Sequence, residues 1–273
     1  MSPAAVASIF RHPVKGLRPE ALARARLDAG RGVAGDRAFA FQFLDDAVPP
    51  ELRAAPAESA PWMSKFNLVV QHDWPELARI VPAWDAVSRK LRLERQGGVF
   101  VDASVETAAG RRELADFIHA FLATSAPYEK ARHGLVAPLR LIGAADLSSR
   151  YTDGATGPVT LATEATFADL ASRLALGSCD ARRFRLNLIL GGAPAWSELG
   201  WVGKRLRVGG CVLEILKPVG RCANIDVNPV TGARDADIYP RLKPTYGHAL
   251  TGVRAEVVQP GEIRLGDSWC LEG

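Results

Sequence analysis

The residues best suited to chemistry lie in a turn around Cys222. In the stretch LKPVGRCANIDVNPVTG, residues 216–232, we expect a strand to end at Lys217 and Pro218 to begin a turn. A cysteine in a turn is more exposed than one inside a strand, and positive charges on Lys217 and Arg221 would stabilise its thiolate. Such a thiolate binds a soft metal or an electrophilic sulfur. The alternative, from the turn alone, is a small apolar side chain that fills space in the core.

The other three cysteines show no such context. Cys211 lies in the apolar run GGCVLEIL and is predicted to belong to the core, and Cys179 and Cys270 are interpreted as structural. No two cysteines form a CxxC pair, which argues against structural zinc. The first ten residues do not resemble a secretory signal, and no apolar run could span a membrane. We therefore expect a cytoplasmic protein with four reduced cysteines.

A second polar set lies in RRFRLNLILGG, residues 182–192, which is predicted to form a strand. Apolar and polar side chains alternate there, so two guanidiniums and an amide would share the face opposite the core. These residues are Arg183, Arg185 and Asn187. Guanidiniums bind phosphate oxygens, and an asparagine amide can bind the edge of a heterocycle. The alternative is a solvated strand face with surface ion pairs.

Two short segments near the N-terminus place a cation beside a turn. The sequence HPVKG contains Lys15, and GDR, some twenty residues later, contains Arg37. Neither segment is specific by itself, because a cation on a loop is usually solvated.

The elements that must position these residues follow from periodicity. Strands are predicted at residues 6–10, 21–27 and 38–43, and a hairpin at residues 91–101 around two glycines. Apolar spacing of 3.6 predicts a helix over residues 111–122 and a second over residues 167–174, with Thr163 as its N-cap and Gly177 beyond its end. Residues 45–61, rich in Ala, Pro and acids, are predicted to form a long loop.

From Arg182 onward the sequence predicts short strands separated by glycine pairs, at residues 184–190, 205–208, 212–217, 253–258 and 262–265. This spacing is typical of a closed or nearly closed barrel. We place a domain boundary near residue 130, with a smaller α+β unit before it. The composition, 48% hydrophobic and 23% charged, is that of a globular chain, and a net charge of +4 argues against a general nucleic-acid-binding protein.

Together these segments match a known pattern. Arg-Phe-Arg-x-Asn, Gly-x-x-Leu-x-Val-Gly, Lys-Pro-x-x-Arg-Cys, Val-x-Pro-x-Thr-Gly and Gly-x-Ile-x-x-Gly-Asp follow one another in this order. The pattern resembles the MOSC domain, which molybdenum-cofactor sulfurases and amidoxime-reducing enzymes share. The HPVKG and GDR segments resemble the family's N-terminal β-barrel domain. The resemblance implies an α+β, predominantly β fold, with an N-terminal β-barrel-like domain over residues 1–130 and a MOSC β-barrel domain over residues 131–273.

The resemblance also implies roles for residues. Cys222 would be the catalytic cysteine and the protein's thiolate ligand to the molybdenum of a molybdopterin cofactor. The residues that would bind the pterin or its phosphate are Lys15, Arg37, Thr160, Thr163, Arg183, Arg185, Asn187 and Arg221. The sequence contains no pyridoxal-phosphate domain and no cysteine-rich iron–sulfur segment, so electrons or sulfur are expected to come from another protein.

The implied function is a molybdenum-dependent oxidoreductase that reduces small N-hydroxylated or N-oxide substrates, with oxygen leaving as water. The electron donor would be a separate ferredoxin- or flavin-type reductase. The alternative is a non-catalytic carrier in which Cys222 holds sulfur from a cysteine desulfurase, or which stores the cofactor. A cysteine–histidine hydrolase using Cys222 and His248 is a third hypothesis.

Four positions depart from the usual pattern of the family. His12 replaces a tyrosine, Gly16 a serine, Ile225 a threonine and Asn228 an aspartate. These changes predict a loop after Cys222 that is adapted to another substrate, or to none.

Overall fold

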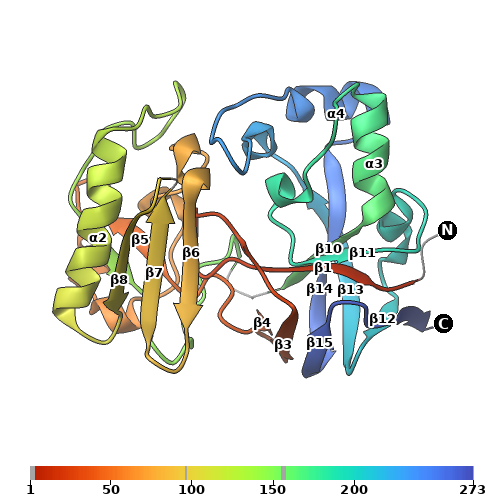
Figure 1. The fold of residues 1–273 in the computed structure, drawn as a ribbon, viewed down its shortest axis with the longest axis horizontal. Helices are drawn as coiled ribbons and strands as arrows, with labels where there is room; N and C mark the ends of the chain where they lie inside the picture. The colour runs from red at the N-terminus through yellow and green to blue at the C-terminus, as the bar shows by residue number, and fades with distance from the viewer. Residues whose placement is uncertain (1–3, 96, 155–157, 273) are drawn as a thin grey trace.

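The computed structural model describes residues 4–95, 97–154 and 158–272, and Figure 1 shows two halves side by side. One half contains α2 (Ala108–Ala123) and a small antiparallel sheet of β6 (Ile80–Asp85), β7 (Lys90–Arg95) and β8 (Val99–Ser104). The other half contains the large sheet, α3 (Glu164–Arg173) and α4 (Ile238–Tyr246). The fold is α+β and mainly β, as predicted.

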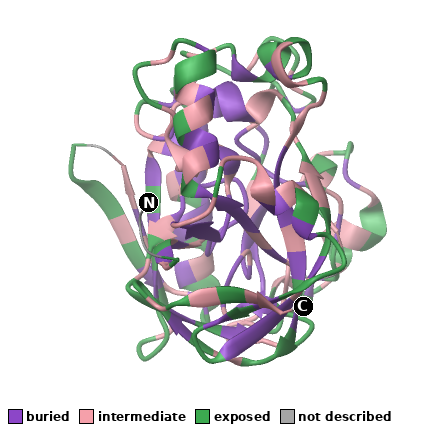
Figure 2. Ribbon diagram, turned by 90° about the vertical axis from the view of Figure 1, so that its right-hand side faces the viewer, coloured by how far each residue is buried: buried purple, intermediate pink, exposed green. Residues whose placement is uncertain are grey.

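The large sheet has eight strands in the order β16-β12-β13-β14-β10-β11-β1-β2. These are β16 (Trp269–Glu272), β12 (Arg205–Val208), β13 (Cys211–Gly220), β14 (Leu250–Gln259), β10 (Val159–Thr163), β11 (Leu188–Leu190), β1 (Val6–Arg11) and β2 (Glu20–Ala21). The pairing is antiparallel except between β10 and β11. Register shifts between β13 and β14 increase the local twist, and the sheet curls into a half-barrel. Figure 2 shows the inner part of this sheet largely buried.

The remaining strands form two smaller sheets. The first joins β15 (Gly261–Arg264), β3 (Arg24–Asp28) and β4 (Gly32–Val33), and the second joins β5 (Ala40–Phe43) and β9 (Leu139–Ile142). Strands β1 and β3, which precede residue 130, therefore pair with strands that follow it. The domain boundary near residue 130 stays a prediction.

The two predicted helices are confirmed. In α2 the side chain of Thr107 accepts a hydrogen bond from the Gly110 amide, and Leu114, Ile118 and Leu122 are buried at helical spacing. Thr163 holds the N-cap position of α3, although its side chain makes no capping hydrogen bond. Short helices are α1 (Pro50–Ala54), η1 (Ala57–Ser59), η2 (Lys65–Asn67), η3 (Pro75–Arg79), η4 (Ala181–Phe184), η5 (Ser197–Trp201) and η6 (Ala223–Asp226).

Three sequence predictions were wrong in detail. The loop over residues 45–61 contains α1 and η1. The strand expected from residue 184 begins at Leu188, because η4 precedes it and Arg185 has a left-handed backbone with φ of 54°. The strand expected to end at Lys217 continues to Gly220, because register shifts on either side of Lys217 and Pro218 accommodate the proline in the sheet.

Two further predictions are confirmed. The hairpin of β7 and β8 forms as predicted, and Cys211 lies in the core. All four cysteines are free. Among the described residues, no helix is both long enough and apolar enough to cross a membrane.

Strand β13 allows a test of the core. We expect Leu213→Ala, at a fully buried leucine, to lower the free energy of unfolding by about 2–5 kcal/mol, because it removes packed methyl groups and leaves a cavity. Leu216→Ala, in the same strand but 44% exposed, should change it by less than about 1 kcal/mol. Urea unfolding measures both. Equal losses would contradict the register of β13.

Candidate functional site

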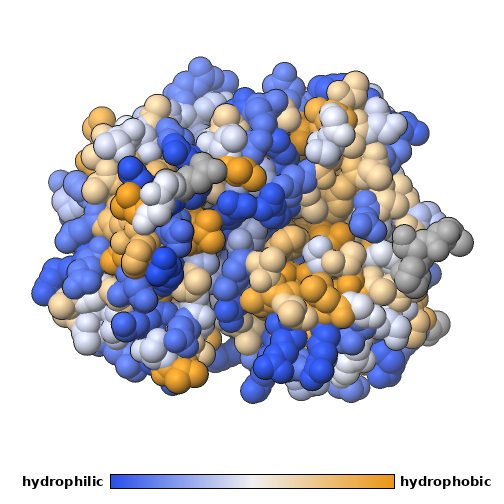
Figure 3. Space-filling view, in the orientation of Figure 1, coloured by the Kyte–Doolittle hydropathy of each residue, from blue (hydrophilic) through white to orange (hydrophobic). Residues whose placement is uncertain are grey.

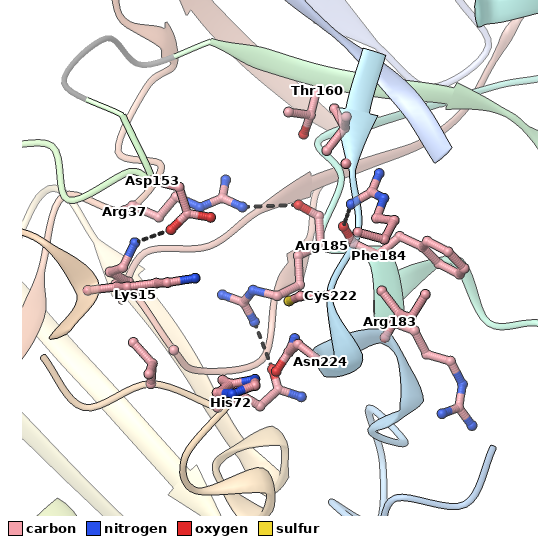
Figure 4. A pocket seen from close by; sticks show the side chains of 18 residues that line it. Lys15, Arg37, His72, Asp153, Thr160, Arg183, Phe184, Arg185, Cys222 and Asn224 are labelled. Atoms are coloured by element: carbon pink, nitrogen blue, oxygen red, sulfur yellow. Dashed lines mark hydrogen bonds and ion pairs between the residues drawn. The ribbon is translucent and has the colours of Figure 1, made fainter. Parts of the chain in front are cut away.

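A pocket of about 870 Å³, including its open mouth, lies between the two halves (Figure 4). The first half contributes Lys15, Arg37, Lys65, Gln71 and His72. The other half contributes Asp153, Thr160, Arg183, Arg185, Arg221, Cys222 and Asn224. Figure 3 shows hydrophilic residues gathered over the middle of the molecule, between the halves.

The lining of the pocket is strongly cationic. Its basic side chains are Lys15, Arg37, Lys65, Arg183, Arg185 and Arg221, and among the described residues Asp153 is the one acid that lines it. A concave site with this imbalance attracts anions, because its walls focus the positive potential.

Cys222 lies at the N-cap of η6, two residues after the end of β13, and it is an exposed residue that lines this pocket. Its basic neighbours are Arg221, which precedes it in the sequence, and Arg185, which the fold brings to it. Lys217, predicted to support the thiolate, is exposed on β13 and is not among the described lining residues. The extension of β13 to Gly220 separates Lys217 from the turn.

Arg185 and Arg221 are held by carbonyl oxygens. Arg221 donates 2.7 Å to the oxygen of Phe184 and also to that of Thr251. Burial lowers the pKa of Arg221 to about 9, and burial together with the charge of Arg37 lowers the pKa of Arg185 to about 10. Both guanidiniums are therefore positive at neutral pH.

Arg37 and Lys15 reach the pocket from the first half. Arg37 donates to the Asp36 carboxylate and, at 3.0 Å, to the carbonyl oxygen of Arg185. The Lys15 ammonium is 2.7 Å from the Asp153 carboxylate. Both residues thus contact the other half of the molecule as well as the pocket.

The structure brings seven of the predicted site residues to one pocket. They are Lys15, Arg37, Thr160, Arg183, Arg185, Arg221 and Cys222. Asn187 and Thr163 are fully buried and are not among the described lining residues. Asn187 accepts hydrogen bonds from Thr160 and donates to the Phe10 carbonyl, and Thr163 bonds with Thr166 and Glu198.

The predicted row of Arg183, Arg185 and Asn187 on one strand face does not form. The 3₁₀ turn and the left-handed Arg185 rotate successive side chains away from an alternating pattern. Arg183 instead donates 2.7 Å to Asp235, and Arg185 donates 2.7 Å to the carbonyl oxygen of Leu17.

No hydrogen bond or ring contact joins His248 to Cys222 among the described residues. Its ring lies 5.7 Å from that of Trp196, centroid to centroid, and it is not among the described pocket residues. The histidine that does line the pocket is His72, whose pKa is lowered by burial.

Sequence reasoning missed Lys65, Gln71, His72, Asp153 and Asn224. None stands in a motif that the sequence analysis singled out except Asn224, two residues after Cys222. Tertiary packing brings the others to the pocket, so spacing along the chain gave no signal.

The departures from the usual family pattern have local structural reasons. Gly16 has φ of 87°, and a Cβ there would lie 2.5 Å from the Val69 carbonyl oxygen, so serine does not fit. Ile225 is 3% exposed and packs in the core. The Asn228 side chain accepts 2.8 Å from the Val230 amide and donates 2.5 Å to Asp235.

The sequence matches two described families in succession. Residues 3–131 match the MOSC N-terminal beta barrel domain, and residues 148–269 match the MOSC domain. Among solved structures, the chain is similar to the YUAD protein from Bacillus subtilis, with 10% identity, 97% of this chain and 93% of that chain covered, and a TM-score of 0.44.

It is also similar to YiiM from Geobacillus stearothermophilus, with 18% identity, and to YiiM from Escherichia coli, with 17% identity. Each comparison covers 42% of this chain and 54% of the other, with a TM-score of 0.32.

The buried His12, on which the charges of Arg37 and Arg185 act, predicts a pH dependence of stability. Burial, with Arg37 and Arg185, lowers the pKa of His12 from 6.5 to about 3. Below pH 6.5 the unfolded chain binds a proton that the folded protein does not bind until about pH 3. The free energy of unfolding should therefore fall as pH falls, with His12 contributing about 2 kcal/mol of the loss between pH 7 and 5. Urea unfolding at pH 7 and pH 5 measures this. Between these pH values, wild type should lose about 2 kcal/mol more of its free energy of unfolding than His12→Gln. Parallel pH profiles of the two proteins would refute the prediction.

Asn228 provides a second test. Asn228→Asp places a second carboxylate against the partly exposed Asp235, so we expect a loss of about 0.5–1 kcal/mol in the free energy of unfolding at pH 7. Changing Asp235 to Asn in the same variant should restore most of it, because a hydrogen bond can form again. Thermal unfolding of the single and double variants makes this comparison. An unaffected single variant would argue against the Asn228–Asp235 contact.

Proposed function

The chain belongs to the MOSC family, with the MOSC N-terminal beta barrel domain followed by the MOSC domain, and from this premise we propose that it binds a molybdenum cofactor and acts as an oxidoreductase. The observation that carries the proposal is the position of Cys222. Its exposed side chain lines the same pocket as cations from both halves of the molecule.

The residues present fit a molybdopterin cofactor. Its phosphate is anionic, and Lys15, Arg37 and Arg185 are cationic groups lining the pocket. Its pterin carries polar edges that the hydroxyl of Thr160 and the amide of Asn224 could contact. The cofactor brings sulfur ligands of its own, so the protein need add one soft thiolate, which Cys222 can supply.

The proposed reaction is the two-electron reduction of a small N-hydroxylated or N-oxide compound, with oxygen leaving as water. When bound, the cofactor would supply the redox chemistry. The chain's own residues hold the phosphate through charge, provide the Cys222 ligand, and leave the mouth of the pocket open to substrate. Electrons come from a separate ferredoxin- or flavin-type reductase.

The exposure of Cys222 also favours a second candidate. Cys211 is fully buried, and burial raises its pKa to about 11, so it is a poor acceptor of sulfur. Cys222 has the access that a carrier needs to take sulfur from a cysteine desulfurase as a persulfide.

Metal analysis tests the oxidoreductase proposal. In protein purified from a host that makes the cofactor, we expect about one molybdenum per chain by mass spectrometry and a loss of at least about tenfold in Cys222→Ala. Cys270→Ala is the matched control, because Cys270 is exposed on β16 and is not among the described pocket residues.

Molybdenum near zero in the wild type, or unchanged in Cys222→Ala, would remove the basis of the proposal. Intact mass then tests the carrier. A gain of about 32 Da under sulfur-donating conditions, absent in Cys222→Ala, corresponds to one added sulfur atom.

A further inference from the structure

Asp153 stands out because it is the one acid among the described residues that line a pocket of cations. Its carboxylate lies 2.7 Å from the Lys15 ammonium. The charges of Arg37 and Lys65 also act on it, and its own charge acts on Arg185. The carboxylate thus lies where an anionic ligand could contact Lys15 and meet the charges of Arg37 and Lys65.

The two partners of this ion pair differ sharply in exposure. The Lys15 side chain is 7% exposed, whereas that of Asp153 is 77% exposed. Lys15 is enclosed by the protein and cannot easily follow a departing partner. The Asp153 carboxylate can turn into solvent, where it regains hydration at little cost.

We propose that Asp153 is a resident counter-ion of the pocket, which neutralises Lys15 in the cofactor-free protein and which the phosphate of an incoming ligand displaces. This inference rests on the proposed function, since it concerns how the same pocket accepts its anion. The chain thereby keeps a buried cation paired before loading, and the pocket favours anions strong enough to replace a carboxylate.

Displacement has a measurable consequence. An anion can use Lys15 only in the fraction of molecules in which Asp153 has moved away, so its apparent affinity is reduced by that fraction. The opposite role, in which Asp153 orients Lys15 for the ligand, predicts that loss of the carboxylate weakens binding. The two roles therefore predict opposite changes in anion affinity when the Asp153 carboxylate is removed.

The test is the binding of inorganic phosphate to the full-length chain from a host that cannot make the cofactor, by calorimetry at pH 7. We expect Asp153→Asn to bind phosphate about tenfold more tightly than wild type. Asp116→Asn, which removes one negative charge from the exposed face of α2, should leave the affinity within about twofold.

A double-mutant cycle separates displacement from a general effect of charge. In a Lys15→Met background, Asp153→Asn should give no gain, because the ammonium that it frees is gone. Unchanged or weaker binding in Asp153→Asn would overturn the inference, as would a tenfold gain that persists without Lys15.

The outcome is distinguishable from failure of the proposed function. If phosphate binds none of the variants, both the counter-ion role and the anion site fail. If wild type and Asp153→Asn bind phosphate equally while the cofactor-loaded wild type contains molybdenum, only the role of Asp153 fails.

Discussion

The pocket depends on the buried guanidinium of Arg185, which bridges the two halves of the molecule. It donates to the Leu17 carbonyl and the Gln71 side chain of the first half, while the Arg185 carbonyl accepts from Arg37. A buried cation is costly unless its hydrogen bonds are satisfied, so these contacts must form together. The same arginine therefore joins the two halves and contributes positive charge to the pocket that lies between them.

A second set of contacts fixes the loop after Cys222. Asp235 accepts from both Arg183 and Asn228, and Arg234 donates to the carbonyls of Ala223 and His72. These bonds tie the segment after the cysteine to the pocket wall and to the opposite half. A thiolate ligand needs such support, since the neighbours of a ligand set its orientation. The unusual Asn228 belongs to this support.

Much of the fold could be predicted because its signals are local. The helical spacing of Leu114, Ile118 and Leu122 and the two glycines of the β7–β8 hairpin depend on neighbours a few residues away. The strand over residues 184–187 was predicted wrongly because that prediction also used only the local sequence pattern. Its alternating pattern is real, but the left-handed turn at Arg185 is held by contacts with distant residues.

The sequence by itself determined the family, the α+β class and Cys222 as the candidate ligand, because residue types in order along the chain carry that information. It did not determine the full set of charged and polar residues that share the pocket with the cysteine. Lys217, five residues before it, is directed elsewhere by β13, while Lys65, Asp153 and His72 arrive from far along the chain. Only the tertiary structure decided this, since the pocket forms where two halves pack and charge acts through space.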